Sequence, residues 1–195
     1  MHGRNRALNM RGGIVNPIRI EIPKELFTPA EIKHYEEDAK LEFLKLGPDL
    51  FEFKEPLHWQ ADITNTGGAL LVTGTVEGEA TGNCARCLEP VTFPVTGEIE
   101  GYFLINAEDA APDDLEEDEF EYLPDDKTIN MAPLIQAALI LEMPQVPLCS
   151  DDCKGLCTEC GANLNDGDCG CSSKHDGEPA KESPFAVLKD FDFGN

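Results

Sequence analysis

Cysteine spacing constrains this chain more than any other feature. Six of its eight cysteines lie between Cys149 and Cys171, and the other two form the upstream pair Cys84 and Cys87. Two cysteines separated by two residues can present both sulfurs to one tetrahedral ion at about 2.3 Å, because the intervening backbone turns around that ion. The 149–171 stretch therefore predicts a structural metal site, with zinc as the preferred ion and an iron–sulfur centre as its competitor.

The spacing also suggests how the ligands divide. Gly161 follows the last CxxC pair, and glycine adopts the positive φ that such a turn often needs. We favour a local site from the last four cysteines and a second site in which the upstream pair folds back onto the other two, giving one or two ions. The candidate ligands are Cys157, Cys160, Cys169, Cys171, Cys149, Cys153, Cys84 and Cys87. Other partitions stay open, and His175 is an alternative ligand.

A disulfide framework is the alternative structural interpretation of so many cysteines. It needs an oxidising compartment, and residues 1–13 contain no apolar run of secretory length. No stretch of the chain approaches the roughly 20 apolar residues that span a bilayer. We therefore expect reduced thiols in a cytoplasmic protein without a membrane segment.

The charge balance restricts the partners. The chain has 38 acidic and 15 basic residues, a formal net charge of −23. Such a field repels polyphosphate, so an extensive RNA interface is disfavoured unless basic residues are segregated. The acidity instead favours a basic protein partner.

Hydrophobic patterning predicts an α+β fold. We expect an antiparallel sheet, able to curl into a barrel, braced by a helix and followed by a cysteine-rich zinc knuckle. The predicted organisation is a flexible tail at 1–13, an antiparallel β-rich domain with the CxxC hairpin at 14–106, an acidic linker at 107–128, a helix packing on the sheet at 129–146, a cysteine-rich metal module at 147–171, and a flexible tail with a short docking segment at 172–195.

Local signals place the elements. Isoleucines spaced through 14–22 predict a strand that ends at Pro23, and the capping-box order after Thr28 predicts a helix over 29–38. Residues 41–53 suit two strands joined by a turn. Residues 58–105 read as a meander with the cysteine pair at a hairpin tip, and Asn130 is the expected N-cap of a helix to Glu142.

The acidic run at 107–126 allows two interpretations. It holds many carboxylates and no basic residue, which is typical of a solvated linker. Its interleaved apolar residues can alternatively anchor a basic protein; they are Leu115, Phe120, Tyr122 and Leu123.

Catalytic patterns are missing from the sequence. We find no phosphate-binding loop, nucleophile elbow or HExxH motif, and eight thiols can fill two four-coordinate sites and leave no position for water. We therefore predict that the protein is not an enzyme. One alternative is a thiol redox protein that uses Cys84 and Cys87, with Arg86 lowering a thiol pKa. Another is an RNA-binding zinc module with four candidate contacts: Arg86, Lys154, Lys174 and Lys181.

Several of these motifs together resemble a known family. They are the CARCLEP stretch at 84–90, the helix leading to Pro144, the cysteine-rich stretch at 147–165 and the SPFAVL stretch at 183–188. In combination they are similar to the YceD-like family of large ribosomal RNA subunit accumulation proteins, over about residues 15 to 191. The resemblance implies a non-catalytic role in 23S ribosomal RNA accumulation and large-subunit biogenesis. Given the acidity of the chain, the expected partners are basic ribosomal or assembly proteins. Many family members have proline where this chain has Thr158, and some lack most of the C-terminal cysteines, which makes metal an elaboration of the family.

Overall fold

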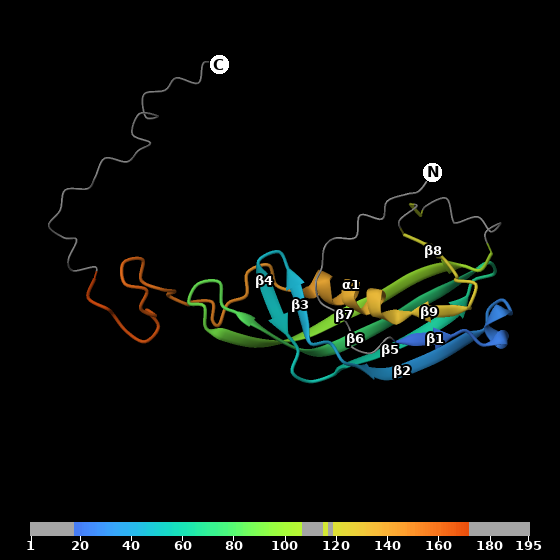
Figure 1. Cartoon of the computed structure of the whole chain (residues 1–195), viewed down its shortest axis with the longest axis horizontal. Helices are drawn as coiled ribbons and strands as arrows, with labels where there is room; N and C mark the ends of the chain where they lie inside the picture. Colours follow the sequence, from blue (N-terminus) through green and yellow to red (C-terminus); the bar gives the residue numbers. More distant parts are fainter. Residues whose placement is uncertain (1–17, 107–114, 117–118, 172–195) are drawn as a thin grey trace, which may run out of the picture.

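The computed structural model describes residues 18–106, 115–116 and 119–171 (Figure 1). The predicted tail at 1–13 and the predicted docking segment in 172–195 lie outside these residues. Within them, no helix is long and apolar enough to cross a membrane.

One long sheet dominates the fold. Its strands are β2 (Ile32–Ala39), β3 (Phe43–Leu46), β4 (Asp49–Glu52), β5 (Leu57–Asn65), β6 (Ala69–Asn83), β7 (Pro90–Leu104) and β8 (Glu121–Tyr122). The order β2-β5-β6-β4-β3 forms one path, and β7 pairs with β6 and, in parallel, with β8. Beside this sheet, β1 (Arg19–Glu21) pairs with β9 (Thr128–Asn130), and a short 3-10 helix, η1 (Lys24–Phe27), follows β1.

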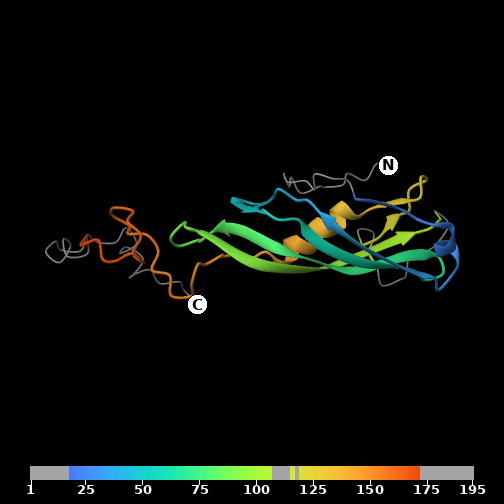
Figure 2. The same ribbon diagram turned by 90° about the horizontal axis from the view of Figure 1, so that it is seen from below.

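The β6–β7 hairpin is the longest feature of the sheet. Its antiparallel ladder runs from Ala69 opposite Leu104 to Asn83 opposite Pro90. Buried residues such as Val72, Val76 and Ile99 alternate with exposed ones, as expected for strands with one face on a core. The hairpin tip carries Cys84 and Cys87, so it brings the upstream pair to one end of an elongated molecule (Figure 2).

The one α-helix of the described residues, α1 (Met131–Glu142), lies along one face of the sheet (Figure 2). Asn130 caps it as predicted, because its side chain accepts a hydrogen bond from the Ala132 N–H at 3.2 Å. Ile135 and Leu139 are buried against the core, together with Trp59, Leu70 and Ile129. The helix thus seals the face of β7 and β6 and ends next to the cysteine-rich segment.

Two expectations were wrong. The sheet is open, not a barrel, because β2 at one edge pairs only with β5 and no described strand joins it to the opposite side. The helix predicted over 29–38 is strand β2, which pairs with β5 from Ile32 opposite Thr64 to Ala39 opposite Leu57. Ala30 has a φ of 67° and donates its N–H to the Asn65 carbonyl. The residues after Thr28 that were predicted to start a helix therefore lead into a strand.

The end of the acidic segment takes part in the fold. Glu121 and Tyr122 form β8, the Leu123 N–H donates to the Leu104 carbonyl at 2.8 Å, and the Leu123 side chain packs on the core. Tyr122 is exposed and stacks edge-on against Phe120. Of the proposed apolar anchors, Leu123 therefore belongs to the core.

The contact between Gly97 and α1 gives a test of this packing. A Cβ at residue 97 would lie 2.7 Å from the Ala138 carbonyl carbon and oxygen. We expect Gly97→Ala to lower the free energy of unfolding by about 2 kcal/mol, since overpacking forces the helix away from the strand. Urea denaturation measures the change, and Glu98→Ala, an exposed neighbour, is the matched control. Equal stability of the two variants would contradict this packing.

Candidate metal centres

The structure gathers the eight cysteines into two groups of four. Cys84, Cys87, Cys149 and Cys153 form the hairpin site. Cys157, Cys160, Cys169 and Cys171 form the C-terminal site. Within each group the sulfurs lie within 4.8 Å of one another, which is the division that the spacing favoured.

The hairpin tip shapes the first pair of ligands. The Leu88 N–H donates to the Cys84 carbonyl at 2.9 Å, and the Cys84 N–H donates to the Glu89 carbonyl at 2.8 Å. Leu88 has a φ of 63°, in the left-handed region that ordinary side chains seldom adopt. The knuckle therefore needs the same backbone conformation that Gly161 supplies in the C-terminal site, at a φ of 73°.

Backbone contacts hold the second pair of ligands against this tip. The Ala85 N–H donates to the Pro147 carbonyl at 2.8 Å. Arg86 Nη1 donates to the carbonyls of Asp151 at 3.1 Å and Cys153 at 3.0 Å. These contacts fix the 147–153 segment so that Cys149 and Cys153 face Cys87 and Cys84.

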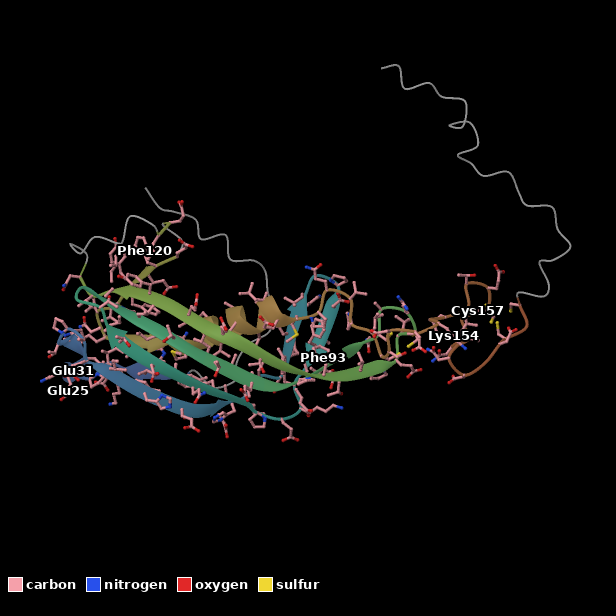
Figure 3. The ribbon with its side chains drawn as sticks, turned by 180° about the vertical axis from the view of Figure 1, so that it is seen from behind. Glu25, Glu31, Phe93, Phe120, Lys154 and Cys157 are labelled. Carbon is pink, nitrogen blue, oxygen red and sulfur yellow. The ribbon has the colours of Figure 1, made fainter. Side chains whose placement is uncertain are left out.

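Turns build the C-terminal site. The Gly161 N–H donates to the Cys157 carbonyl at 2.9 Å, and the Cys157 N–H donates to the Ala162 carbonyl at 2.8 Å. Gly170, between the last two ligands, has a φ of 73°. This site lies beyond the hairpin tip, at the end of the molecule marked by Lys154 and Cys157 in Figure 3.

Asn165 joins the two sites, a role that the sequence analysis missed. Its Nδ2 donates to Cys153 Sγ at 3.3 Å, and its Oδ1 accepts from the Lys154 N–H at 2.8 Å. The Leu164 N–H also donates to the Gly155 carbonyl at 2.9 Å. A residue of the C-terminal loop thus hydrogen-bonds a sulfur of the hairpin site. Its position between the CxxC pair at 157–160 and the CxC pair at 169–171 is the only sequence signal that could have pointed to it.

Sulfur geometry fits a tetrahedral ion. Cys84 Sγ lies 3.7 Å from Cys153 Sγ, and Cys87 Sγ lies 3.6 Å from Cys149 Sγ. Metal–sulfur bonds of 2.3 Å at tetrahedral angles place neighbouring sulfurs about 3.8 Å apart. All eight cysteines are free thiols rather than disulfides. Both groups can therefore hold a metal through four sulfurs each.

The hairpin site is the better shielded of the two. Cys84, Cys87 and Cys153 are buried, and Leu148 and Leu156 pack against them. The C-terminal sulfurs belong to half-buried or exposed residues. Water and chelators therefore reach the C-terminal site more easily.

The pKa values of the thiols differ strongly within each group. The Cys87 and Arg86 amides lower the pKa of Cys84 to about 6 against the opposing effect of burial. The Glu89 amide acts to lower the pKa of Cys87, yet burial and the neighbouring sulfurs raise it to about 12. In the C-terminal site the amides of Cys160 and Glu159 lower the pKa of Cys157 to about 7. The hydrogen bond from Asn165 also lowers the pKa of Cys153. Some thiolates therefore form readily in each site, and a bound cation would stabilise the others.

This geometry corrects the expected role of Arg86. Its guanidinium donates to two carbonyls, and the low pKa of Cys84 comes first from the Cys87 amide. Cys84 is fully buried, and Cys87 is 3% exposed. A substrate disulfide cannot reach either sulfur while the site is closed, which argues against the thiol redox alternative.

The described residues do not form a basic RNA-binding surface around these sites. Arg86 is engaged with the 149–153 turn. Lys154 follows Asp151 and Asp152 in the chain and lines the same pocket as Glu159. His175, Lys174 and Lys181 lie outside the described residues.

Comparison with known proteins places the chain in a family. The family model for the large ribosomal RNA subunit accumulation protein YceD matches residues 72–192. This chain belongs to the YceD family. The match covers most of β6 and all of β7, α1 and both cysteine groups.

Individual relatives match over shorter parts. An uncharacterized protein of Mycobacterium tuberculosis is 38% identical over 102 residues, 52% of this chain and 48% of its own length. The maize large ribosomal RNA subunit accumulation protein YCED homolog 1, chloroplastic, is 29% identical over 137 residues, 57% of this chain and 47% of its own length. The chain thus spans about half the length of these relatives. No solved structure matches it.

Metal content tests the two-site arrangement. We expect two zinc ions per chain after purification under reducing conditions, because each group supplies four sulfurs. The double variant Cys84→Ser/Cys87→Ser should retain one ion, and so should Cys157→Ser/Cys160→Ser. Elemental analysis measures the stoichiometry. Metal-free protein with eight freely alkylated thiols would contradict the assignment.

Release kinetics test the link through Asn165. A chelator should remove zinc in two phases, the C-terminal site first and the shielded hairpin site second. We expect Asn165→Ala to weaken the affinity of the hairpin site about tenfold, since hydrogen bonds to ligand atoms tune metal binding to this extent. A colorimetric chelator follows the release.

Asp166→Ala, at the exposed adjacent residue, is the control for this experiment. It should leave the slow phase unchanged. A slow phase that is identical in Asn165→Ala and in the unmodified chain would mean that the two sites act independently.

Proposed function

We propose that this protein is a non-catalytic factor that supports 23S ribosomal RNA accumulation and large-subunit biogenesis, with two structural zinc ions. The observation that carries the proposal is the pair of four-cysteine groups within the region that matches the YceD family model. The maize relative is named a large ribosomal RNA subunit accumulation protein.

The chemistry of the sites supports a structural role for the metal. Four sulfurs complete the tetrahedral coordination of zinc, so no position is left for a reacting water. The metal would instead hold the 147–171 segment on the hairpin tip, 62 to 69 residues away along the chain. Coordination by four thiolates requires reduced cysteines, which fits a compartment in which thiols stay reduced, such as the cytoplasm.

Charge supports a protein partner. With a formal net charge of −23, the chain attracts basic proteins and repels RNA phosphates. Ribosomal and assembly proteins have the required charge. The effect on ribosomal RNA would then be indirect, through the delivery or protection of such a protein.

Depletion in cells tests the proposed function. We expect the ratio of 23S to 16S ribosomal RNA to fall when the protein is removed and to recover with the unmodified gene. Cys84→Ser/Cys87→Ser should restore it poorly, because the tip and the 147–153 segment separate without the metal. Gel electrophoresis of total RNA and sucrose-gradient profiles of the subunits measure the outcome.

Glu25→Gln, an exposed substitution at the opposite end of the sheet, is the control and should restore the ratio fully (Figure 3). An unchanged ratio after complete removal of the protein would refute the proposed function.

A further inference from the structure

The outer edge of β7 is open beside α1. β7 pairs with β6 along its whole length, whereas on its other side β8 pairs only with Phe103 and Leu104. No described residue pairs with that side between Thr96 and Gly101. An exposed sheet edge is a template for another strand, and most proteins protect such edges.

The register determines which backbone groups face outward. On the inner side, the Ile105 N–H donates to the Gly68 carbonyl, and on the outer side the Leu104 carbonyl accepts from Leu123. Because these directions alternate along an antiparallel strand, Thr96, Glu98 and Glu100 direct their N–H and carbonyl groups outward. Among the described residues, none pairs with these groups, so an added strand could do so.

Two prolines limit the open edge at its other end. Pro90 and Pro94 have the same outward direction as Glu98, and neither has an N–H group. Prolines of this kind are tolerated only where a strand edge faces solvent. The edge available for pairing is therefore a short window between Pro94 and the strand β8.

A groove of mixed polarity runs beside this window, with Glu142 of α1 also in its lining. It has a volume of about 210 Å³ and is formed by the β7 edge at Glu98 and Glu100 and by the flank of α1 at Leu134, Ala137 and Leu141. Leu141 is 81% exposed. A strand that extends the sheet here would place every second side chain beside this apolar flank.

Its other side chains would meet carboxylates. Gly97 and Ile99 are buried on the α1 side of β7, so the exposed Glu98 and Glu100 side chains point to the opposite face. Cross-strand neighbours on that face interact directly, and opposite charges stabilise the pair. The best-fitting strand is thus apolar on one face and basic on the other.

We propose that the β7 edge between Thr96 and Gly101 binds an extended segment of a basic protein, which adds to the sheet as a strand with alternating apolar and basic side chains. The backbone groups of Glu98 and Glu100 supply the hydrogen bonds, Leu134 and Leu141 the apolar contact, and the two carboxylates the selectivity. The proposal rests on the proposed function and specifies its partner surface. The chain's own 172–195 stretch fits less well, because it holds more acidic than basic residues.

A synthetic peptide tests strand addition. The probe is a fluorescein-labelled ten-residue peptide of alternating lysine and valine, and binding to the full chain is followed by fluorescence anisotropy. We expect saturable binding that weakens as salt rises, since the charge pairs are exposed. A peptide of the same composition in scrambled order should bind at least tenfold more weakly. Equal affinity of both peptides would overturn the proposal.

A proline substitution separates edge pairing from charge attraction. Glu98→Pro removes an outward N–H, as Pro94 does, and leaves the ladder with β6 intact. We expect it to weaken binding about tenfold or more relative to Glu98→Gln, which removes the same charge but keeps the N–H. Circular dichroism and zinc content show that both variants are folded. Identical affinities of these two folded variants would overturn the proposal.

Backbone methylation of the probe gives an independent measurement on the unmodified protein. Two peptides are compared, with N-methyl groups on the lysines in one and on the valines in the other. Only alternate amides of an added strand face β7, so one peptide should lose binding and the other should keep it. Equal effects of the two modifications would overturn strand addition.

Charge-reversal variants test the location. Glu98→Lys/Glu100→Lys should abolish binding, whereas Glu25→Lys/Glu31→Lys, which makes the same charge change at the far end of the sheet, should lower affinity only slightly (Figure 3). Equal losses would overturn the assignment to this edge. Tenfold tighter binding by a chain that lacks residues 172–195 would also overturn it, by identifying that segment as the occupant.

Failure of this proposal can be distinguished from failure of the proposed function. The ratio of 23S to 16S ribosomal RNA after depletion tests the function without reference to the edge. A reduced ratio combined with full rescue by Glu98→Pro would overturn the edge proposal alone.

Discussion

The pairing of β6 with β7 is the interaction on which the rest of the structure depends. The ladder joins fifteen residues of each strand and carries the hairpin tip away from the core. The inner face of the same hairpin supports α1, and Gly97 allows the helix backbone to approach the strand. α1 in turn leads into the segment that supplies Cys149 and Cys153. A cysteine pair and a distant cysteine-rich segment therefore meet because one hairpin and one helix run to the same end of the molecule.

The acidity of the chain and its metal chemistry oppose each other. Four thiolates add negative charge to a protein that already carries a formal net charge of −23. Burial and neighbouring sulfurs raise the pKa of Cys87 to about 12, and neighbouring sulfurs and burial do the same for Cys171. Hydrogen bonds from backbone amides make deprotonation easier at Cys84 and Cys157, where they lower the thiol pKa. Deprotonating the other thiols stays unfavourable with hydrogen bonds alone. A divalent ion therefore suits these groups better than a hydrogen-bond network by itself.

Sequence reasoning was reliable where a local signal determines the structure. The capped helix after Asn130, the turn at Gly161 and the meander with its cysteine tip are local features, and the structure contains each of them. Contacts between residues far apart in the sequence determined the features that sequence reasoning missed. Thr28 and Glu31 have the order of a helix start, but eight residues of β2 pair with β5 and override that preference. Asn165 contacts Cys153 only because two loops fold together, so composition and spacing could not reveal it.

The hairpin site has a consequence for the order of events during synthesis. Its two halves are separated by 62 to 69 residues, and its fourth ligand, Cys153, follows α1 in the chain. During synthesis the β6–β7 hairpin leaves the ribosome long before Cys149 and Cys153 do. Until then, Cys84 and Cys87 at the hairpin tip lack the other two cysteines of their group. Closing so long a loop carries an entropic cost that the four sulfur bonds must offset. Metal capture at the hairpin site would therefore come late, after α1 and Cys153 have been synthesised.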